Sequence, residues 1–213
     1  MKIHGDFQAP VHIRTDDQPW VPSPMPGVSR IMLDRVGGEV AWATSLVRYA
    51  PGSQFSAHTH GGGEEFLVLE GVFQDENGDY PAGTYVRNAP GTRHTPGSLN
   101  GCTILVKLWQ FYPGDSESCV VRTQFNAHLL CDNGFERVEL LVLEPGQSIQ
   151  RPAVEGFECW VLSGSSEAWA PGDWVRVCAA KPMAIKAGDQ GLVCWIKTGH
   201  LRDVPARLAR LPV

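Results

Sequence analysis

The stretch AHTHGGGEEFLVLEG, Ala57 to Gly71, decides how the rest of this sequence is interpreted. His58 and His60 are separated by one residue, and on a β-strand residues i and i+2 point to the same face. The three glycines that follow permit a tight reversal of the chain. The next run, which starts at Glu64, is strongly apolar and is predicted to be a strand. It could therefore return a carboxylate to the point that both imidazoles face.

A third imidazole could come from His94 in the stretch APGTRHTPG, which follows another predicted strand. Three neutral nitrogens and one carboxylate oxygen suit a borderline divalent ion such as Zn, Fe, Ni, Cu or Mn. An isolated His-x-His pair is more often a surface or core feature, so the prediction depends on the full set. Strand alternation favours Glu64 over Glu65 as the ligand. A glycine turn can change which residues of the next strand face the barrel, so alternation supports this choice without proving it. Glu65 is expected either to interact with a ligand residue without contacting the metal itself, or to lie at the surface.

Short β-prone runs and turn residues extend along the chain. Of the 213 residues 43% are hydrophobic, and the 23 glycines and 16 prolines are spread out, as in proteins with many short strands. Thr44–Tyr49 and Cys102–Tyr112 are predicted strands, and Asn77-Gly78 predicts a hairpin because both residues tolerate positive φ. The first half contains no long amphipathic helical pattern. The sequence therefore predicts an all-β fold.

The second half repeats the plan of the first. LVRYAPGSQF resembles LVLEPGQSIQ, VLEG resembles VLSG, and PAGTYVR resembles APGDWVR, in the same order. Three ordered matches indicate an internal duplication of a unit of about 100 residues. The boundary is predicted near Pro113-Gly114, which gives a metal-binding domain over residues 1–113 and a second domain over residues 114–213.

The second half lacks the candidate ligands. Alignment places Pro152 over His58, Val154 over His60, Phe157 near Glu64, Glu158 over Glu65 and Met183 over His94. Proline and valine cannot ligate a metal, and a thioether suits soft ions. We therefore expect one metal ion per chain and a degenerate second domain without one. Its aromatic side chains could line a ligand pocket, but core packing is the simpler expectation.

The ligand spacing resembles the two motifs of the cupin family. The first, G-x5-HxH-x3,4-E-x6-G, is matched by Gly52, His58, His60, Glu64 and Gly71. The second, G-x5-PxG-x2-H-x3-N, is matched at Gly83, Gly91 and His94, whereas Ala89 and Ser98 replace its proline and asparagine. Together with the duplication, this resemblance implies two tandem cupin barrels of the double-stranded β-helix, or jelly-roll, type.

A more specific resemblance is to the cupin domain of ChrR-type anti-sigma factors. It rests on WVPSPMPGV, on the segment from Thr44 to His94 and on GCTILVKLWQ, which cover most of residues 20–110. In that family the domain binds zinc through two histidines, a glutamate and a further histidine. The resemblance thus implies His58, His60, Glu64 and His94 as ligands and zinc as the first expectation, with Fe(II), Ni or Mn as alternatives.

Two functions remain open at this point. The ChrR resemblance implies a regulatory, stress-sensing role beside a sigma factor. The sequence has no His-x3-Cys-x2-Cys signature of the sigma-binding zinc domain, so we do not expect sigma inhibition by this chain on its own. The alternative is a metal-dependent enzyme, such as an Fe(II) dioxygenase that cleaves a β-diketone-like substrate, because a five- or six-coordinate ion keeps open positions. No catalytic group beyond the ligands is evident.

Charge and hydropathy restrict the partners. The net charge is −5 without a basic run in the body of the chain, so nucleic-acid binding is not expected. No stretch approaches the ~20 apolar residues of a membrane span, and the N-terminus lacks a signal-peptide core, so a cytoplasmic location is expected. The six cysteines form no CxxC pair and are expected to be buried apolar residues. A small molecule, a sigma factor or other regulatory protein, and a second copy of the chain remain open as partners.

Other polar residues are expected to be structural. Arg48 and Arg87 lie on predicted strands, where surface ion pairs are favoured over binding of an anionic ligand. The remaining histidines have no partner at ligand spacing. The tail HLRDVPARLARLPV has apolar residues at roughly helical spacing and is predicted to form a short docking helix, with a partner-binding tail as the alternative.

Overall fold

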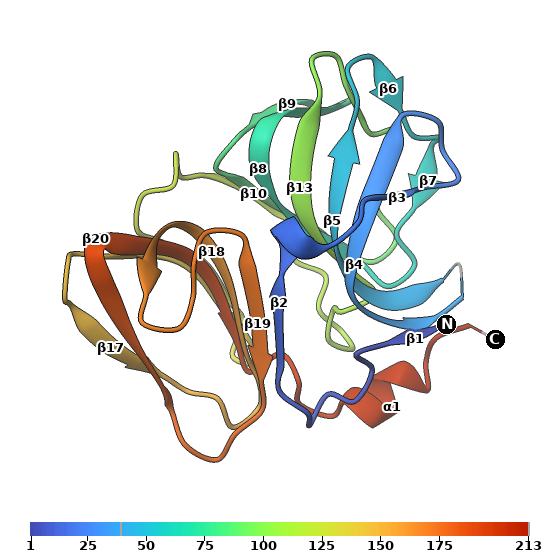
Figure 1. Cartoon of the computed structure of the whole chain (residues 1–213). Helices are drawn as coiled ribbons and strands as arrows, with labels where there is room; N and C mark the ends of the chain where they lie inside the picture. Colours follow the sequence, from blue (N-terminus) through green and yellow to red (C-terminus); the bar gives the residue numbers. More distant parts are fainter. Residues whose placement is uncertain (39, 213) are drawn as a thin grey trace. The chain divides into compact units, whose positions relative to one another are not determined.

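The computed structural model of the protein describes residues 1–38 and 40–212. All strand pairings in this part of the chain are antiparallel. The chain divides into two compact units (Figure 1). Unit 1 contains Met1–Gly5, Pro19–Gln124 and Pro205–Val213, and unit 2 contains Asp6–Gln18 and Phe125–Val204. The predicted all-β class is confirmed, and each unit has its own sheet and its own apolar interior.

Unit 1 is built on a sheet with the strand order β1-β4-β5-β13-β8-β10-β14 (Figure 1). Its strands are β1 (Lys2–Ile3), β3 (Val21–Pro22), β4 (Val28–Gly37), β5 (Ala41–Tyr49), β6 (Ser53–Gln54), β7 (His58–Thr59), β8 (Glu64–Asp75), β9 (Gly78–Pro81), β10 (Thr84–Asn88), β11 (Arg93–His94), β12 (Gly97–Ser98), β13 (Cys102–Leu108) and β14 (Cys119–Arg122). The short strands β7 and β11 pair with each other. The predicted hairpin at Asn77-Gly78 joins β8 to β9.

Unit 2 has a sheet with the order β15-β16-β20-β18-β19-β2, and β17 pairs with β20. Its elements are β2 (Val11–Arg14), a 3-10 helix (Thr15–Asp17), β15 (His128–Asp132), β16 (Arg137–Leu143), β17 (Ser148–Arg151), β18 (Phe157–Ser166), β19 (Asp173–Val177) and β20 (Met183–Thr198). The interior between these strands is apolar throughout and includes Phe157, Trp169 and Cys194. Core packing therefore accounts for Phe157 and Trp169.

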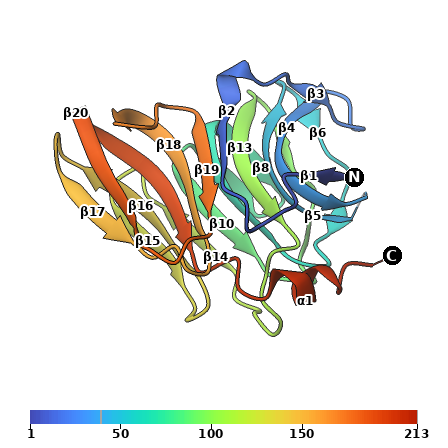
Figure 2. The ribbon, with the colours of Figure 1, turned by 60° about the horizontal axis from the view of Figure 1, so that its bottom comes forward.

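Each half of the sequence contributes one strand to the sheet of the other unit. β2 lies between β1 and β3 of unit 1 in the sequence, yet it pairs with β19 of unit 2, where Arg14 faces Asp173 (Figure 2). β14 lies beyond the predicted boundary near residue 113 and just before β15 of unit 2, yet it pairs with β10 of unit 1, where Arg122 faces Thr84. The units thus interchange strands across the predicted boundary near residue 113, and the change from unit 1 to unit 2 falls after Gln124.

The repeated sequence motifs adopt the same backbone geometry in both units. Gly71 and Gly164, the last residues of VLEG and VLSG, have φ values of 71° and 70°. A Cβ atom on Gly71 would lie 2.1 Å from the carbonyl oxygen of Gly101, and one on Gly164 would lie 2.2 Å from that of Gly191. Only glycine fits such a close approach of two backbones. The two repeated motifs therefore have the same backbone framework in both units.

Alternation along β8 sets the interior of unit 1. Phe66 and Val68 lie in the buried apolar cluster together with Tyr49 and Phe73. Glu64 precedes Phe66 by two residues and so begins the same face of the strand. This confirms the predicted alternation and directs the first carboxylate of β8 into the barrel.

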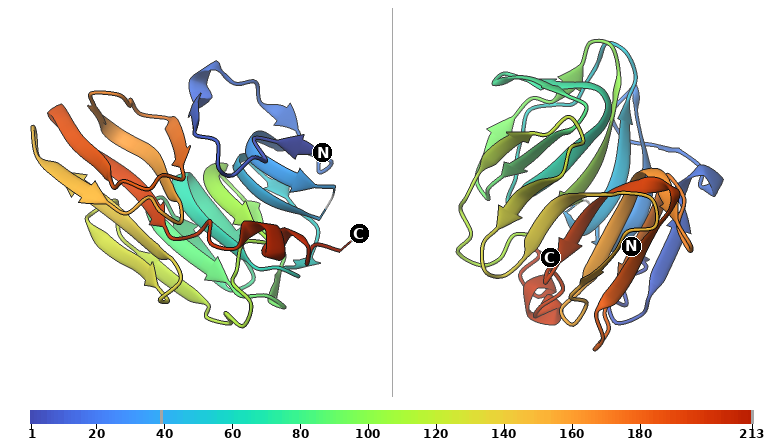
Figure 3. Two further views of the ribbon diagram at one scale, coloured as in Figure 1. Left: turned by 90° about the horizontal axis from the view of Figure 1, so that it is seen from below. Right: turned by 90° about the vertical axis from the view of Figure 1, so that its left-hand side faces the viewer.

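The C-terminal segment forms helix α1 (Val204–Leu208), the short red helix next to the C-terminus in Figure 3. Arg207 is only 7% exposed. Its guanidinium lies 3.9 Å from the ring centroid of Tyr112 and 4.6 Å from that of Trp42, and it donates a hydrogen bond to the carbonyl of Gln110. The helix is therefore anchored in unit 1 by an arginine. No helix in the described residues is long and apolar enough to cross a membrane.

We predict that Arg207→Ala lowers the free energy of unfolding by about 2 kcal/mol, because it removes two cation–π contacts and a charge-assisted hydrogen bond. Urea unfolding measures the loss. Arg210→Ala, at an exposed position in the same segment, is the matched control and should change stability by less than about 0.5 kcal/mol. Equal losses for the two variants would contradict the anchoring role.

Candidate metal centre

Three short segments of unit 1 bring the four predicted ligands together. His58 lies in β7, His60 follows that strand, Glu64 opens β8, and His94 lies in β11. The pairing of β7 with β11 sets His94 directly opposite His58. The backbone N–H of His60 donates to the carbonyl of Thr92 at 2.9 Å, which holds the loop after β7 beside β11.

The ligand atoms of these four side chains all lie within 4.8 Å of one another. The Nε2 atoms of His60 and His94 are 3.2 Å apart. The Oε2 atom of Glu64 is 3.4 Å from Nε2 of His60 and 3.5 Å from Nε2 of His94. His60, Glu64 and His94 are buried, whereas His58 is half-buried. The structure thus places all four predicted residues in one cluster.

Hydrogen bonds on the far side of the rings orient His58 and His94. Nδ1 of His58 is 2.9 Å from the carbonyl oxygen of Ser56. Nδ1 of His94 is 3.1 Å from Oδ2 of Asp75. A carbonyl or carboxylate oxygen can only accept, so Nδ1 carries the proton in each neutral ring. The Nε2 lone pair of each ring is consequently available to a metal.

The same logic applies to His60. Its Nδ1 is 3.0 Å from the hydroxyl oxygen of Thr92. That hydroxyl donates its own hydrogen to the carbonyl of Ala89 at 2.7 Å, so it accepts from His60. In their neutral forms all three histidines therefore present an unprotonated Nε2 to the cluster.

This arrangement fits a cation. Two nitrogen lone pairs that face each other at 3.2 Å repel unless a positive charge lies between them. Burial lowers the pKa of His60, and the neighbouring imidazoles of His94 and His58 lower it further, against an opposing effect of Glu64. His60 is therefore neutral near pH 7. Three neutral nitrogens and a carboxylate oxygen match the donors of divalent transition metals.

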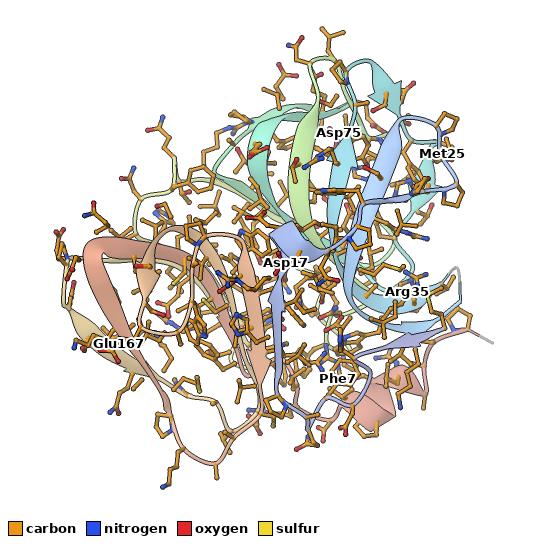
Figure 4. The ribbon with its side chains drawn as sticks, in the orientation of Figure 1. Phe7, Asp17, Met25, Arg35, Asp75 and Glu167 are labelled. Atoms are coloured by element: carbon orange, nitrogen blue, oxygen red, sulfur yellow. The ribbon has the colours of Figure 1, made fainter. Side chains whose placement is uncertain are left out.

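Neighbouring polar side chains hold Glu64 and Asp75. Asn88, opposite Glu64 on β10, donates to its Oε2 at 3.1 Å. Asp75, labelled in Figure 4, ends β8 in unit 1, and its Oδ1 accepts from the backbone of Asn77 at 2.8 Å and from the hydroxyl of Tyr80 at 3.1 Å. Burial and the charge of Asp75 raise the pKa of Tyr80 to about 12, so this phenol remains a donor.

Asp75, Asn88 and Thr92 are residues of the site that the sequence did not reveal. Asp75 lies two residues before the predicted turn at Asn77-Gly78, where aspartate is common for its turn-forming hydrogen bonds. Its contact with His94 depends on how β8 and β11 meet in space. No spacing rule in the sequence distinguishes such a carboxylate from an ordinary turn residue.

Glu65 and Arg87 lie deeper than predicted, although Arg87 does form ion pairs. Glu65 is not at the surface: it is buried on the opposite face of β8 from Glu64, with its Oε2 3.7 Å from Nε of Arg87. Arg87 is buried as well; its Nη2 is 2.9 Å from Oδ2 of Asp115, and its guanidinium lies over Phe111. Both faces of this sheet are covered, and alternation alone does not show that. Arg48 is exposed, and its guanidinium carbon lies 3.9 Å from the ring centroid of Trp20.

In unit 2, Ala153 takes the place of His60. The carbonyl of Ala153 accepts from the backbone of Gly156 at 3.2 Å and of Ala179 at 2.9 Å. The carbonyl of His60 accepts in the same way from Gly63 at 3.4 Å and Gly91 at 2.8 Å. Val154, the predicted counterpart, is instead 61% exposed. The alignment on Pro-Gly is therefore shifted by one residue.

The same shift puts Arg151, not Pro152, at the position of His58. Arg151 faces Met183 in the pairing of β17 with β20, as His58 faces His94. The guanidinium of Arg151 makes a two-pronged ion pair with Glu139, in which Nη2 and Oε2 are 3.1 Å apart. The predicted correspondences of Met183 with His94 and of Phe157 with Glu64 agree with the strand pairing. Unit 2 thus has an ion pair and apolar groups where unit 1 has its cluster.

Solved structures share this fold. A putative dioxygenase from Nostoc punctiforme is 15% identical, with 93% of this chain and 85% of that chain covered and a TM-score of 0.66. The pirin YhhW from Escherichia coli, in complex with nickel(II), is 14% identical, with 89% and 98% covered and a TM-score of 0.66. The protein Ylba from E. coli is 13% identical, with 93% and 94% covered and a TM-score of 0.69. At these identities the likeness concerns the fold alone.

Comparison with curated proteins gave no match. The family model of the ChrR cupin-like domain matches residues 8–112, which include every member of the histidine–glutamate cluster. Strand topology, ligand spacing and family match agree, and residues 8–112 of this chain belong to the ChrR cupin-like domain family.

Proposed function

We propose that this protein binds one divalent transition-metal ion through His58, His60, Glu64 and His94 and acts as a metal-dependent regulatory sensor. The observation that carries the proposal is the orientation of the three imidazoles. Each has its Nδ1 committed to an oxygen acceptor and its Nε2 directed at the cluster. Such outer hydrogen bonds are a regular feature of histidines that ligate metals.

The sensor proposal is supported by the way the ligands are distributed. They come from three separate segments: β7 with its following loop, the start of β8, and β11. A bound ion joins these segments, and its release frees them. Four protein donors suffice to close a tetrahedral zinc site, and closed sites are structural or sensory in character. A sigma factor or another regulatory protein is the partner class that this role implies.

The alternative is a metal-dependent oxygenase, for example one that cleaves a β-diketone-like substrate. One observation favours it: His58 is half-buried while the other three ligands are buried, so solvent approaches the cluster from the side of His58. A five- or six-coordinate ion, such as Fe(II), would keep exchangeable positions on that side.

Metal analysis after anaerobic purification separates these functions. We expect one equivalent of metal per chain, because unit 2 has Arg151, Ala153, Phe157 and Met183 at the matching positions. Stoichiometric zinc without an exchangeable position supports the sensor. Bound Fe(II) that consumes O₂ with a diketone favours the oxygenase and removes the pure sensor. Two equivalents per chain would contradict the interpretation of unit 2.

We predict that Asp75→Asn weakens metal binding by about ten- to a hundredfold. The amide can still accept from Asn77 and Tyr80, but its NH₂ group then faces Nδ1 of His94. His94 is pushed to the other tautomer, whose Nε2–H blocks coordination. Competition with a chromophoric chelator for Zn²⁺ measures the affinity.

The control for this variant is Asp79→Asn in the same hairpin. Asp79 is exposed and accepts only from the side chain of Gln74 among the interactions described for its carboxylate. Its replacement should leave the affinity unchanged. Equal affinities for the Asp75 and Asp79 variants would show that the carboxylate behind His94 does not set its tautomer.

A further inference from the structure

Trp109 has an unusual backbone conformation beside the ligand loop. It follows β13 and has φ of 61°, in the left-handed region that residues with a side chain rarely adopt. Its ring lies against Gly61 and Gly62. A Cβ atom on Gly61 would be 2.7 Å from Cζ2 of the ring, and one on Gly62 would be 2.3 Å from Cδ2. The two glycines therefore leave room for this ring.

The backbone of the same segment holds the loop directly. The N–H of Trp109 donates to the carbonyl of Gly63 at 3.0 Å, and the N–H of Phe111 donates to that of Gly62 at 3.5 Å. The ring of Phe111 packs on Gly63, whose added Cβ would lie 2.3 Å from the ring. The loop 61–63 connects His60 to Glu64. Residues 109–111 thus fix the short connection between two of the four ligands.

Unit 2 has the equivalent backbone hydrogen bond, but a glycine stands there in place of the tryptophan. The N–H of Gly199 donates to the carbonyl of Gly156 at 3.0 Å, and Gly199 has φ of 79°. Val154 and Glu155 stand where unit 1 has Gly61 and Gly62. The left-handed turn is therefore made by glycine in the unit that lacks the ligands. In unit 1, which has the ligands, Trp109 makes this turn despite its side chain, and its ring packs on Gly61 and Gly62.

We propose that Trp109 is a positioning residue of the metal centre. Its ring presses on Gly61 and Gly62 and holds the loop so that His60 and Glu64 stand at the spacing one ion requires. Strained backbone that persists beside a functional site is commonly part of how that site is preorganised. This inference rests on the proposed metal site.

The segment is braced on the side away from the loop. The side-chain amide of Gln110 donates to the carbonyl of Ala43 at 2.9 Å and to the hydroxyl of Thr44 at 3.2 Å. The carbonyl of Gln110 accepts from Arg207 of the C-terminal segment. Trp109 is therefore held between a fixed neighbour and the glycine loop.

A double-mutant cycle with Co²⁺ tests the inference. The proteins are the wild type, Trp109→Gly, Gly62→Ala and the double variant. We expect Trp109→Gly to release Co²⁺ to excess EDTA about tenfold faster than the wild type. Gly62→Ala should also accelerate release, because its methyl group collides with the ring. In the Trp109→Gly background the same alanine should add little, since no ring remains to collide with it.

The absorption bands of bound Co²⁺ provide a second readout, because they report ligand geometry and not global stability. Both single variants should shift these bands. Trp20→Gly, which removes another half-buried tryptophan of unit 1, is the control and should keep the wild-type bands and release rate. If Trp109→Gly does not fold, Gly62→Ala still tests the ring–loop contact.

The outcomes separate the two proposals. A wild-type protein that binds no Co²⁺ overturns both the metal site and the role of Trp109. A wild type that binds Co²⁺, with unchanged bands and release in Trp109→Gly and Gly62→Ala, overturns the role of Trp109 and leaves the metal site standing. Fully additive effects in the cycle, or an equal effect of Trp20→Gly, would also overturn it.

Discussion

The site depends on the hydrogen bonds behind its histidines. Ser56, Thr92 and Asp75 each accept a hydrogen bond from an Nδ1–H group, which leaves three Nε2 lone pairs directed at one point with the carboxylate of Glu64. Inside a buried cluster this arrangement is unfavourable without a cation, because lone pairs and a negative charge face one another. The loops and strands around it hold the groups in place. The strand pairing of β7 with β11, the start of β8 and the hairpin at Asp75 all serve that geometry.

Unit 2 shows what the barrel requires without such a site. It keeps the close backbone approach at Gly164 and the backbone hydrogen bond that Gly156 accepts from Gly199. It also keeps a glutamate, an arginine and a lysine in the same register on three neighbouring strands, Glu158, Arg176 and Lys197 in place of Glu65, Arg87 and Lys107. The four candidate ligands are replaced by an arginine in a bidentate ion pair and by apolar side chains. The strand framework and the histidine–glutamate cluster are therefore separable features of this chain.

The sequence was sufficient for the parts of the site that depend on local periodicity. His58, His60 and Glu64 follow from alternation and spacing, and His94 follows from the second motif. The predicted counterparts of His58 and His60 in unit 2 were wrong by one residue, because the segment after Pro145-Gly146 is one residue shorter than the segment after Pro51-Gly52. The alignment on Val-Leu-x-Gly, which matched Phe157 with Glu64, keeps the register. Asp75 and Thr92 were missed because their roles arise from contacts between distant segments. The burial of Arg87 was missed because alternation does not reveal that both faces of a sheet are covered.

Long-range ¹H–¹⁵N NMR of the histidine side chains tests the central claim most directly, since it reports which ring nitrogen carries the proton. We expect that, in the metal-free protein at neutral pH, His58, His60 and His94 each carry the proton on Nδ1. One equivalent of Zn²⁺ should then shift the Nε2 resonance of all three and of no other histidine. A proton on Nε2 of any of the three, or Nε2 resonances that do not respond to Zn²⁺, would contradict it.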